Sequence, residues 1–227
     1  MSRNRKILVT STVLLVLAAG LGFGSFATFN AQTNNAGNAF AYGTIVLSNT
    51  KHGGSACLST GGGSTDTNVN PACDQLFNLS AKKPGDSSTA NVTLKNVGSF
   101  DASTFKVFMP ACTGSNASGE TYHGTANPCA ALQVYVQQWS DSGFSTPSAC
   151  LYGGATVTNT CDFSDTAKTL GAFTTSYSSS SNGLAIGSGL TSGSSAYFTI
   201  GVKSASSADN SSQGRQAAFD LDWYIAQ

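Results

Sequence analysis

The sequence predicts an all-β fold, a jelly-roll-like antiparallel β-sandwich with long polar loops that follows a helical signal peptide. Short runs in which apolar and polar residues alternate recur along the chain, and this period of two is typical of strands with one buried face. No run of similar length after the first 27 residues keeps the helical period of about 3.6 residues. The 227 residues include a single glutamate, and Ser, Thr, Asn and Gly dominate the polar set, which favours strands and turns over helices.

The expected strands are short and are separated by glycine-rich connections. The clearest alternating runs lie at residues 91–97, 104–109, 132–139, 196–203 and 218–226, with shorter candidates at 43–48 and 76–81. Residues 218–226 show the pattern best, because one face is entirely apolar and the other is polar. The apolar face comprises Phe219, Leu221, Trp223 and Ile225. This strand should therefore have one side in a core.

Three polar insertions are expected to form surface loops, at residues 51–74, 110–128 and 174–195. The third consists almost entirely of Ser, Gly, Thr and Asn, and we expect it to be mobile. Residues 83–86, KPGD, predict a tight turn, because proline presets φ and glycine tolerates a positive value.

The first 27 residues have the pattern of an export signal. A basic opening at residues 3–6 precedes an apolar segment at residues 7–26, and small residues stand at the two positions that a signal peptidase requires. Cleavage after Ala27 would give a mature chain that begins at Thr28. An uncleaved membrane anchor is the alternative, since a helix of this length would just span a bilayer. In both cases the rest of the chain is expected outside the cytoplasm, either secreted or at the cell surface.

Composition limits the partners of the mature chain. Three of the eleven Lys and Arg residues lie in the signal, which leaves eight basic against eleven acidic residues from Thr28 onward. This mildly negative charge argues against nucleic acid and against anionic membrane surfaces as partners. A chain of about 200 residues is long enough for one substantial core. We therefore expect a single domain at residues 43–227, after an N-terminal segment at residues 28–42.

All six cysteines follow the signal, and an even number in an exported chain predicts a disulfide framework. Sequential pairing is favoured, because each successive pair brackets a loop rich in Gly, Ser, Asn or Pro. The expected pairs are Cys57 with Cys73, Cys112 with Cys129, and Cys150 with Cys161. Each bond would contribute about 2 to 4 kcal/mol by restricting the unfolded chain. A metal site is the weaker alternative, since the chain has no C-x-x-C pair and only two histidines.

Four segments follow one another in a recognisable order: TFN at residues 28–30, FAYGTIVLS at 40–48, NLSAKKPGD at 78–86 and VTLKNVGS at 92–99. In this order they resemble the TasA/camelysin family. Members of that family pair a TxxF-x-x-G-T-hydrophobic-x-L-S segment with a later L-K-P-G-D turn and a strand that ends in N-x-G. Residues 219–227 are similar to the last strand of the family. The cysteine-bearing loops have no counterpart in this resemblance.

The resemblance implies a jelly-roll subunit that is exported, cut by a signal peptidase of the SipW type, and assembled into extracellular fibres of a biofilm matrix or cell surface. In such fibres the N-terminal segment of one subunit supplies a strand to the sheet of its neighbour, and an exposed sheet edge offers the unpaired backbone groups that this requires. The donor here would be residues 28–40, with Phe29 and Phe40 as candidate anchors. Partners would be further copies of the chain, joined head-to-tail, and other matrix components. A frayed terminus, or the first strand of the chain's own sheet, is the alternative.

The family also carries a metallo-endopeptidase label. A zinc peptidase of the common kind needs H-E-x-x-H on a helix. Residues 119–123, GETYH, supply only the E-x-x-H part, and Gly119 stands where the first histidine would be. The sequence therefore favours a structural protein with no catalytic residues and no cofactor. A secreted metallo-endopeptidase and a monomeric adhesin or glycan-binding module remain the alternatives.

Two further sets of residues have a structural and a functional interpretation. Trp139 and Trp223 lie in alternating runs and are interpreted as core residues, with a carbohydrate-binding platform as the alternative. Asp162 and Asp165 are interpreted as turn residues rather than calcium ligands, because the D-x-D-x-D-G spacing is absent.

Overall fold

The computed structural model describes residues 2–4, 7, 9–13, 41–62, 68–80 and 82–227. The chain divides into two compact units, Met1–Ala41 and Tyr42–Gln227. In the first unit, all the described residues from 3 to 13 are helical. Among the described residues, no helix has the length and apolar character needed to cross a membrane.

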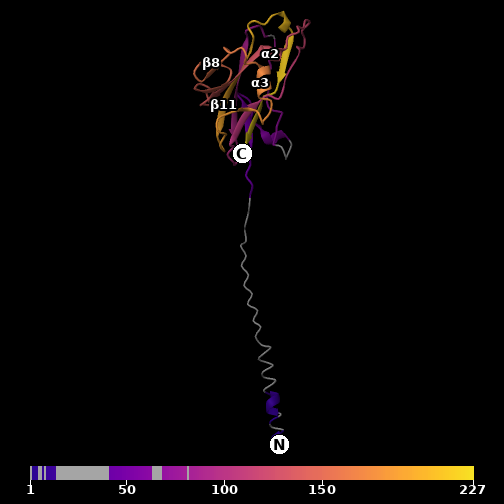
Figure 1. The fold of residues 1–227 in the computed structure, drawn as a ribbon, viewed down its shortest axis with the longest axis vertical. Coiled ribbons are helices and arrows are strands. Elements are labelled where there is room, and N and C mark those ends of the chain that lie inside the picture. The colour runs from indigo at the N-terminus through magenta and orange to yellow at the C-terminus, as the bar shows by residue number, and fades with distance from the viewer. Residues whose placement is uncertain (1, 5–6, 8, 14–40, 63–67, 81) are drawn as a thin grey trace. The chain divides into compact units, whose positions relative to one another are not determined.

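The second unit is built on a six-stranded antiparallel sheet (Figure 1). The strands in spatial order are β2 (Cys57–Leu58), β1 (Leu47–Lys51), β3 (Ser87–Asn96), β11 (Ser195–Ser204), β6 (Leu132–Trp139) and β7 (Pro147–Tyr152). Successive side chains of the three central strands β3, β11 and β6 point to opposite faces of the sheet. One of these faces carries the fully buried residues Val92, Phe198 and Val136. This face is one wall of the core.

A second layer covers that wall. It contains β10 (Leu184–Ala185), β4 (Thr104–Phe108) and β13 (Asp222–Ala226), in that order, and the separate pair β5 (Cys112–Asn116) and β12 (Arg215–Phe219). The ring of Phe198 lies 5.8 Å from that of Phe105 in β4 and 4.9 Å from that of Trp223 in β13. The two layers therefore share one core, and the predicted all-β antiparallel sandwich is confirmed.

Smaller elements close the ends and the outer face. They are β8 (Gly154–Val157), β9 (Thr160–Asp162), α2 (Pro128–Ala131), α3 (Leu170–Ser176) and the 3-10 turns η1 (Ser59–Gly62) and η2 (Asn210–Ser212). The β8–β9 hairpin lies against the outer face of the large sheet, where the buried Gln137 side chain accepts a hydrogen bond from the Cys161 amide at 2.6 Å. The same side chain donates to the Asn159 carbonyl at 2.9 Å.

Three of the expected strands differ in the structure. The candidate at residues 43–48 becomes a strand only from Leu47 onward, where β1 begins. Residues 218–226 form two strands rather than one, because β12 pairs with β5 whereas β13 pairs with β4. The break lies opposite Pro110, which has no amide hydrogen for a strand ladder. Residues 76–80 form no strand, and the adjacent side chains of Leu76 and Phe77 both pack against the core.

The third polar insertion is not simply a surface loop, contrary to the expectation for residues 174–195. It contains the end of α3 and all of β10, and it buries Ile186 and Leu190 in the core. The few apolar residues of this segment are spaced so that their side chains point into the core. Its polar residues bind one another, since the Asn182 carboxamide accepts a hydrogen bond from the Ser179 amide at 2.8 Å. The polar composition of the segment gave no indication of these core contacts.

Candidate assembly surface

The residues that the sequence singles out for processing and assembly lie outside the described part of the chain. They are Ala27, Thr28, Phe29 and Phe40. The structure does describe the sheets to which an added strand would have to pair. The acceptor side of the predicted assembly can therefore be sought among the sheet edges of the second unit.

β13 has an open and regular sheet edge, and so do β5 and β12, which pair only with each other over five residues without a shift. β13 is the candidate in the two larger sheets. The edge strands β2 and β10 have only two residues each. The edge strand β7 begins at Pro147 and shifts register twice against β6, and both features hinder pairing with another chain. β13 pairs with β4 over all five of its residues without a shift. No hydrogen bond joins its far side to any residue that the structure describes.

The register of β4 shows which backbone groups of β13 point to this open side. The Ile186 amide donates to the Phe105 carbonyl at 2.8 Å, so Phe105 directs its backbone groups toward β10. Its register partner in β13 is Ile225, which must then direct its own N–H and C=O away from β4. Since this orientation alternates along a strand, Trp223 does the same, whereas Tyr224 bonds to Lys106. The open edge thus presents the backbone groups of Trp223 and Ile225.

The side chains of the same two residues line the inner face of the edge. Both pack partly buried against the core. The indole of Trp223 lies between the layers, 4.9 Å from Phe198 and 6.4 Å from Phe105 between ring centroids. Its Nε1–H is buried and has no hydrogen-bond partner among the described residues. A buried donor without an acceptor is unusual and costly in a native fold.

The outer face of the edge carries Asp222 and Tyr224. Tyr224 is exposed, whereas Asp222 is half-buried. Burial, and secondly the neighbouring Asp220 carboxylate, raise the pKa of Asp222. A charge on an edge strand opposes pairing with another strand, and a raised pKa makes that charge easier to remove by protonation.

The six cysteines form the three disulfides that the sequence predicted. The Cα–Cα distances are 5.5 Å for Cys57–Cys73, 6.0 Å for Cys112–Cys129 and 4.8 Å for Cys150–Cys161. Each bond closes a single loop, with 16, 17 and 11 residues of separation respectively. Three such bonds are typical of a chain that matures in an oxidising compartment.

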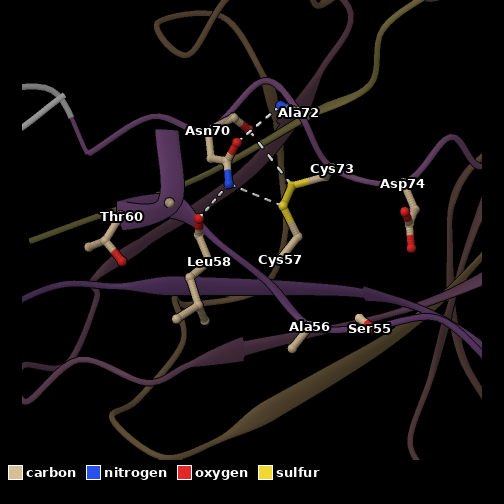
Figure 2. A pocket seen from close by; sticks show the side chains of 10 residues that line it. Ser55, Ala56, Cys57, Leu58, Thr60, Asn70, Ala72, Cys73 and Asp74 are labelled. Carbon is tan, nitrogen blue, oxygen red and sulfur yellow. Dashed lines mark hydrogen bonds between the residues drawn. A yellow bond between two sulfur atoms is a disulfide. The ribbon is translucent and has the colours of Figure 1, made fainter. Parts of the chain in front are cut away.

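Figure 2 shows the first of these disulfides in the wall of an open recess of about 410 Å³. The Asn70 carboxamide spans the recess, donating to the Leu58 carbonyl at 2.9 Å and accepting from the Ala72 amide at 3.0 Å. Among the lining residues that the structure describes, Asp74 is the only ionisable group. These contacts tie the two ends of the Cys57–Cys73 loop to each other rather than prepare a ligand site.

The two tryptophans lie on opposite faces of the large sheet. Trp223 packs in the core, as predicted, but Trp139 lies on the outer face, where its Nε1–H donates to the Thr199 hydroxyl at 2.7 Å. Phe144 lies over this outer face, 6.1 Å from the ring of Tyr197. Trp139 and Trp223 therefore do not share one platform.

The residues weighed for metal chemistry have other partners. His123 Nδ1 lies 2.9 Å from the Gly214 carbonyl, and Glu120 is exposed in an irregular segment. Asp162 accepts hydrogen bonds from the amide and the hydroxyl of Ser164, as a turn residue does, and these bonds lower the pKa of its carboxyl. No group of three or more His, Cys, Asp or Glu side chains is placed to hold a metal within the described ranges.

Neither a protein-family model nor a curated protein sequence matches the chain. The assembly surface therefore rests on the geometry of the domain. Sequence reasoning predicted the last strand but not its position at a sheet edge. Alternation of apolar and polar residues identifies a strand, but it does not show which strands pair with it. The sequence does indicate that Trp223 and Ile225 belong together, because their even spacing places both side chains on one face of a strand.

Proposed function

We propose that the chain is an exported structural protein whose copies assemble head-to-tail into extracellular fibres of a biofilm matrix or cell surface. The N-terminal segment of one subunit adds as a strand to the open edge of β13 in the next. The observation that carries this proposal is the edge itself: five residues in regular register, with outward backbone groups at Trp223 and Ile225. Such an edge needs either protection or a partner.

The buried indole of Trp223 supports the same proposal. An incoming strand brings carbonyl groups beside the edge, and a shift of the buried indole on binding would let one of them accept from the Trp223 Nε1–H, which has no acceptor among the described residues. Assembly would thus satisfy a donor that the single subunit leaves unpaired.

The export signal and the resemblance to the TasA/camelysin family support the part of the proposal that concerns export and the donor segment. Cleavage after Ala27 by a signal peptidase of the SipW type would release Thr28 and free the donor. Residues 28–40 are long enough to pair with the whole of β13 at about 3.3 Å per residue. Because donor and acceptor are different surfaces, the contact does not close on itself and produces a filament.

Phe29 and Phe40 cannot both fill the space beside Trp223 in one regular strand. They are separated by an odd number of positions, so their side chains point to opposite faces. One of them is therefore the inward anchor, and alanine substitution of each in turn identifies it by the larger loss of assembly.

Electron microscopy of the purified mature chain tests the proposal. The chain from Thr28 is expected to form filaments, and a variant that lacks residues 28–40 is expected to form none because the donor is missing. A third variant, with residues 28–40 replaced by a Gly/Ser segment of equal length, separates the role of the sequence from that of length. Filaments that persist in both variants would contradict strand donation.

A further inference from the structure

The segment through which the N-terminal residues join the domain is held from two sides. Residues 44–47, here called the anchor segment, lead into β1, of which Leu47 is the first residue, and they bind first to the turn after β3. The Ser99 and Val97 amides donate to the carbonyls of Thr44 and Val46, both at 2.8 Å. The Thr44 amide in turn donates to the Ser99 hydroxyl at 2.8 Å.

Gly98 allows this close approach. A Cβ atom at that position would lie 2.4 Å from the Thr44 carbonyl oxygen and 2.7 Å from the Val46 nitrogen, closer than such atoms come in real structures. The backbone of the anchor segment therefore passes directly over Gly98. A larger residue there would push the anchor segment away.

The Cys57–Cys73 loop holds the anchor segment from the other side. The Leu47 amide donates to the Ser59 hydroxyl at 3.0 Å, and that hydroxyl donates to Asn68 Oδ1 at 2.8 Å. The Asn68 carboxamide completes the chain of bonds by donating from Nδ2 to the Ile45 carbonyl. Two side chains of the loop thus bind the backbone of the anchor segment on either side of Val46.

The disulfide and Asn70 keep these two side chains in place. The Cys57–Cys73 bond joins the ends of the loop, and Asn70 bonds the Leu58 carbonyl from the opposite limb (Figure 2). Asn68 has a φ of 49°, a left-handed conformation that asparagine tolerates better than most residues. This conformation places its carboxamide at both Ser59 and Ile45.

We propose that Ser59 and Asn68, which lie in the described parts of the Cys57–Cys73 loop, form a clamp that fixes the point at which the N-terminal segment leaves the domain, and that both act as positioning residues for assembly. This inference rests on the proposed function. With the clamp closed, the donor begins at a fixed point of the subunit, and the spacing between subunits is defined. With the clamp open, residues 44–47 would lengthen a flexible tether, which lowers the effective concentration of the donor at its acceptor and adds ordering entropy to each contact.

Asn68→Gly tests the clamp with little change to the backbone, since glycine adopts the same φ without strain. The variant is expected to raise the concentration needed for filament formation, measured by sedimentation, by about tenfold, because bonds that hold the donor's origin are lost. Amide exchange at Leu47 should become faster, while the melting temperature of the subunit stays close to that of the wild type.

Asn159→Gly is the matched control. Asn159 also has a left-handed backbone, with a φ of 60°, but it lies in the β8–β9 turn away from the anchor segment. This variant should assemble and exchange at Leu47 as the wild type does. Ser59→Ala should repeat the effect of Asn68→Gly, and the double substitution Cys57→Ser with Cys73→Ser should exceed it.

The outcomes separate the two proposals. If Asn68→Gly assembles at the same concentration as Asn159→Gly, the clamp has no role in assembly and the inference fails, whatever happens at Leu47. If the mature wild type forms no filaments, the proposed function fails. Exchange at Leu47 then still shows whether the loop holds the anchor segment.

Discussion

Asp222 carries the only charge on the candidate acceptor strand, in a half-buried position on its outer face. Burial, and then Asp220, raise the pKa of its carboxyl group. A raised pKa means that the folded chain binds this proton more tightly than the unfolded chain does. The ionised form therefore costs stability at pH values above the folded pKa, and the cost disappears below the unfolded value of about 3.9.

Asp222→Asn is accordingly expected to raise the free energy of unfolding at pH 7 by less than about 1 kcal/mol, since solvent screens a half-exposed group. The difference from wild type should shrink as the pH falls from 7 toward 3.5. Urea unfolding of the mature chain, kept below the concentration at which it assembles, measures it across this range.

Asp209→Asn provides a comparison of opposite sign. Hydrogen bonds from the hydroxyl and the amide of Ser211 lower the pKa of Asp209. Its ionised form therefore stabilises the fold, and the substitution should reduce stability at neutral pH. If Asp222→Asn also reduced stability at pH 7, the assigned environment of Asp222 would be incorrect.

The two tryptophans illustrate how far single residues could be placed from the sequence. The alternation of apolar and polar residues predicted that both lie in strands with their side chains in the core, and this is correct for Trp223. Trp139 was misplaced, although the sequence held the information: it stands three positions after Val136, and an odd spacing puts the two side chains on opposite faces. The Trp223 Nε1–H without an acceptor depends on packing between the layers, and no local pattern reports it.

Sequence reasoning missed several elements, among them β5, β7, the β8–β9 hairpin and α3. α3 spans seven residues, too few for a helical period to stand out, yet Leu170 and Phe173 are fully buried on its inner face. Thr169 caps its N-terminus by accepting from the Ala172 amide at 3.2 Å. The capping threonine and the spacing of the two apolar residues are the signals that could have identified it.

Phe173→Ala should lower the free energy of unfolding by about 3 to 5 kcal/mol, because it removes a fully buried ring that packs 4.8 Å from the ring of Tyr152. Thr174→Val on the same helix is the control. Its hydroxyl is buried and has no partner among the described residues, so its removal should be neutral or stabilising by up to about 1 kcal/mol. Denaturant unfolding measures both. Equal effects of the two substitutions would show that α3 is not part of the core.

The β12–β13 segment shows a different limit at the scale of elements. The sequence predicted a strand over residues 218–226 and the correct inward face, and both strands observed there keep that face. The break between them and the open edge of β13 depend on β4 and β5, which lie more than a hundred residues earlier. Edge status is therefore a property of the sheet, and alternation within one strand does not encode it.

At the scale of the whole molecule, the sandwich and the disulfide pairing followed from composition, alternation and cysteine spacing. These features were predictable because each depends on nearby residues: a strand on its own pattern, a disulfide on the loop that it closes. The clamp on the anchor segment was not predictable, since it joins three separate parts of the chain, at Ile45, Ser59 and Ser99. Its elements have no common sequence motif.

Hydrogen exchange of the β13 amides, compared between the unassembled subunit and the filament, tests the central claim most directly. In the subunit, the amides of Trp223 and Ile225 point to the open edge and should exchange rapidly, whereas the Tyr224 amide is bonded to β4 and should exchange slowly. On assembly, Trp223 and Ile225 should become protected while Tyr224 remains so. Filaments in which the Trp223 and Ile225 amides still exchange as fast as in the subunit would contradict strand addition at this edge.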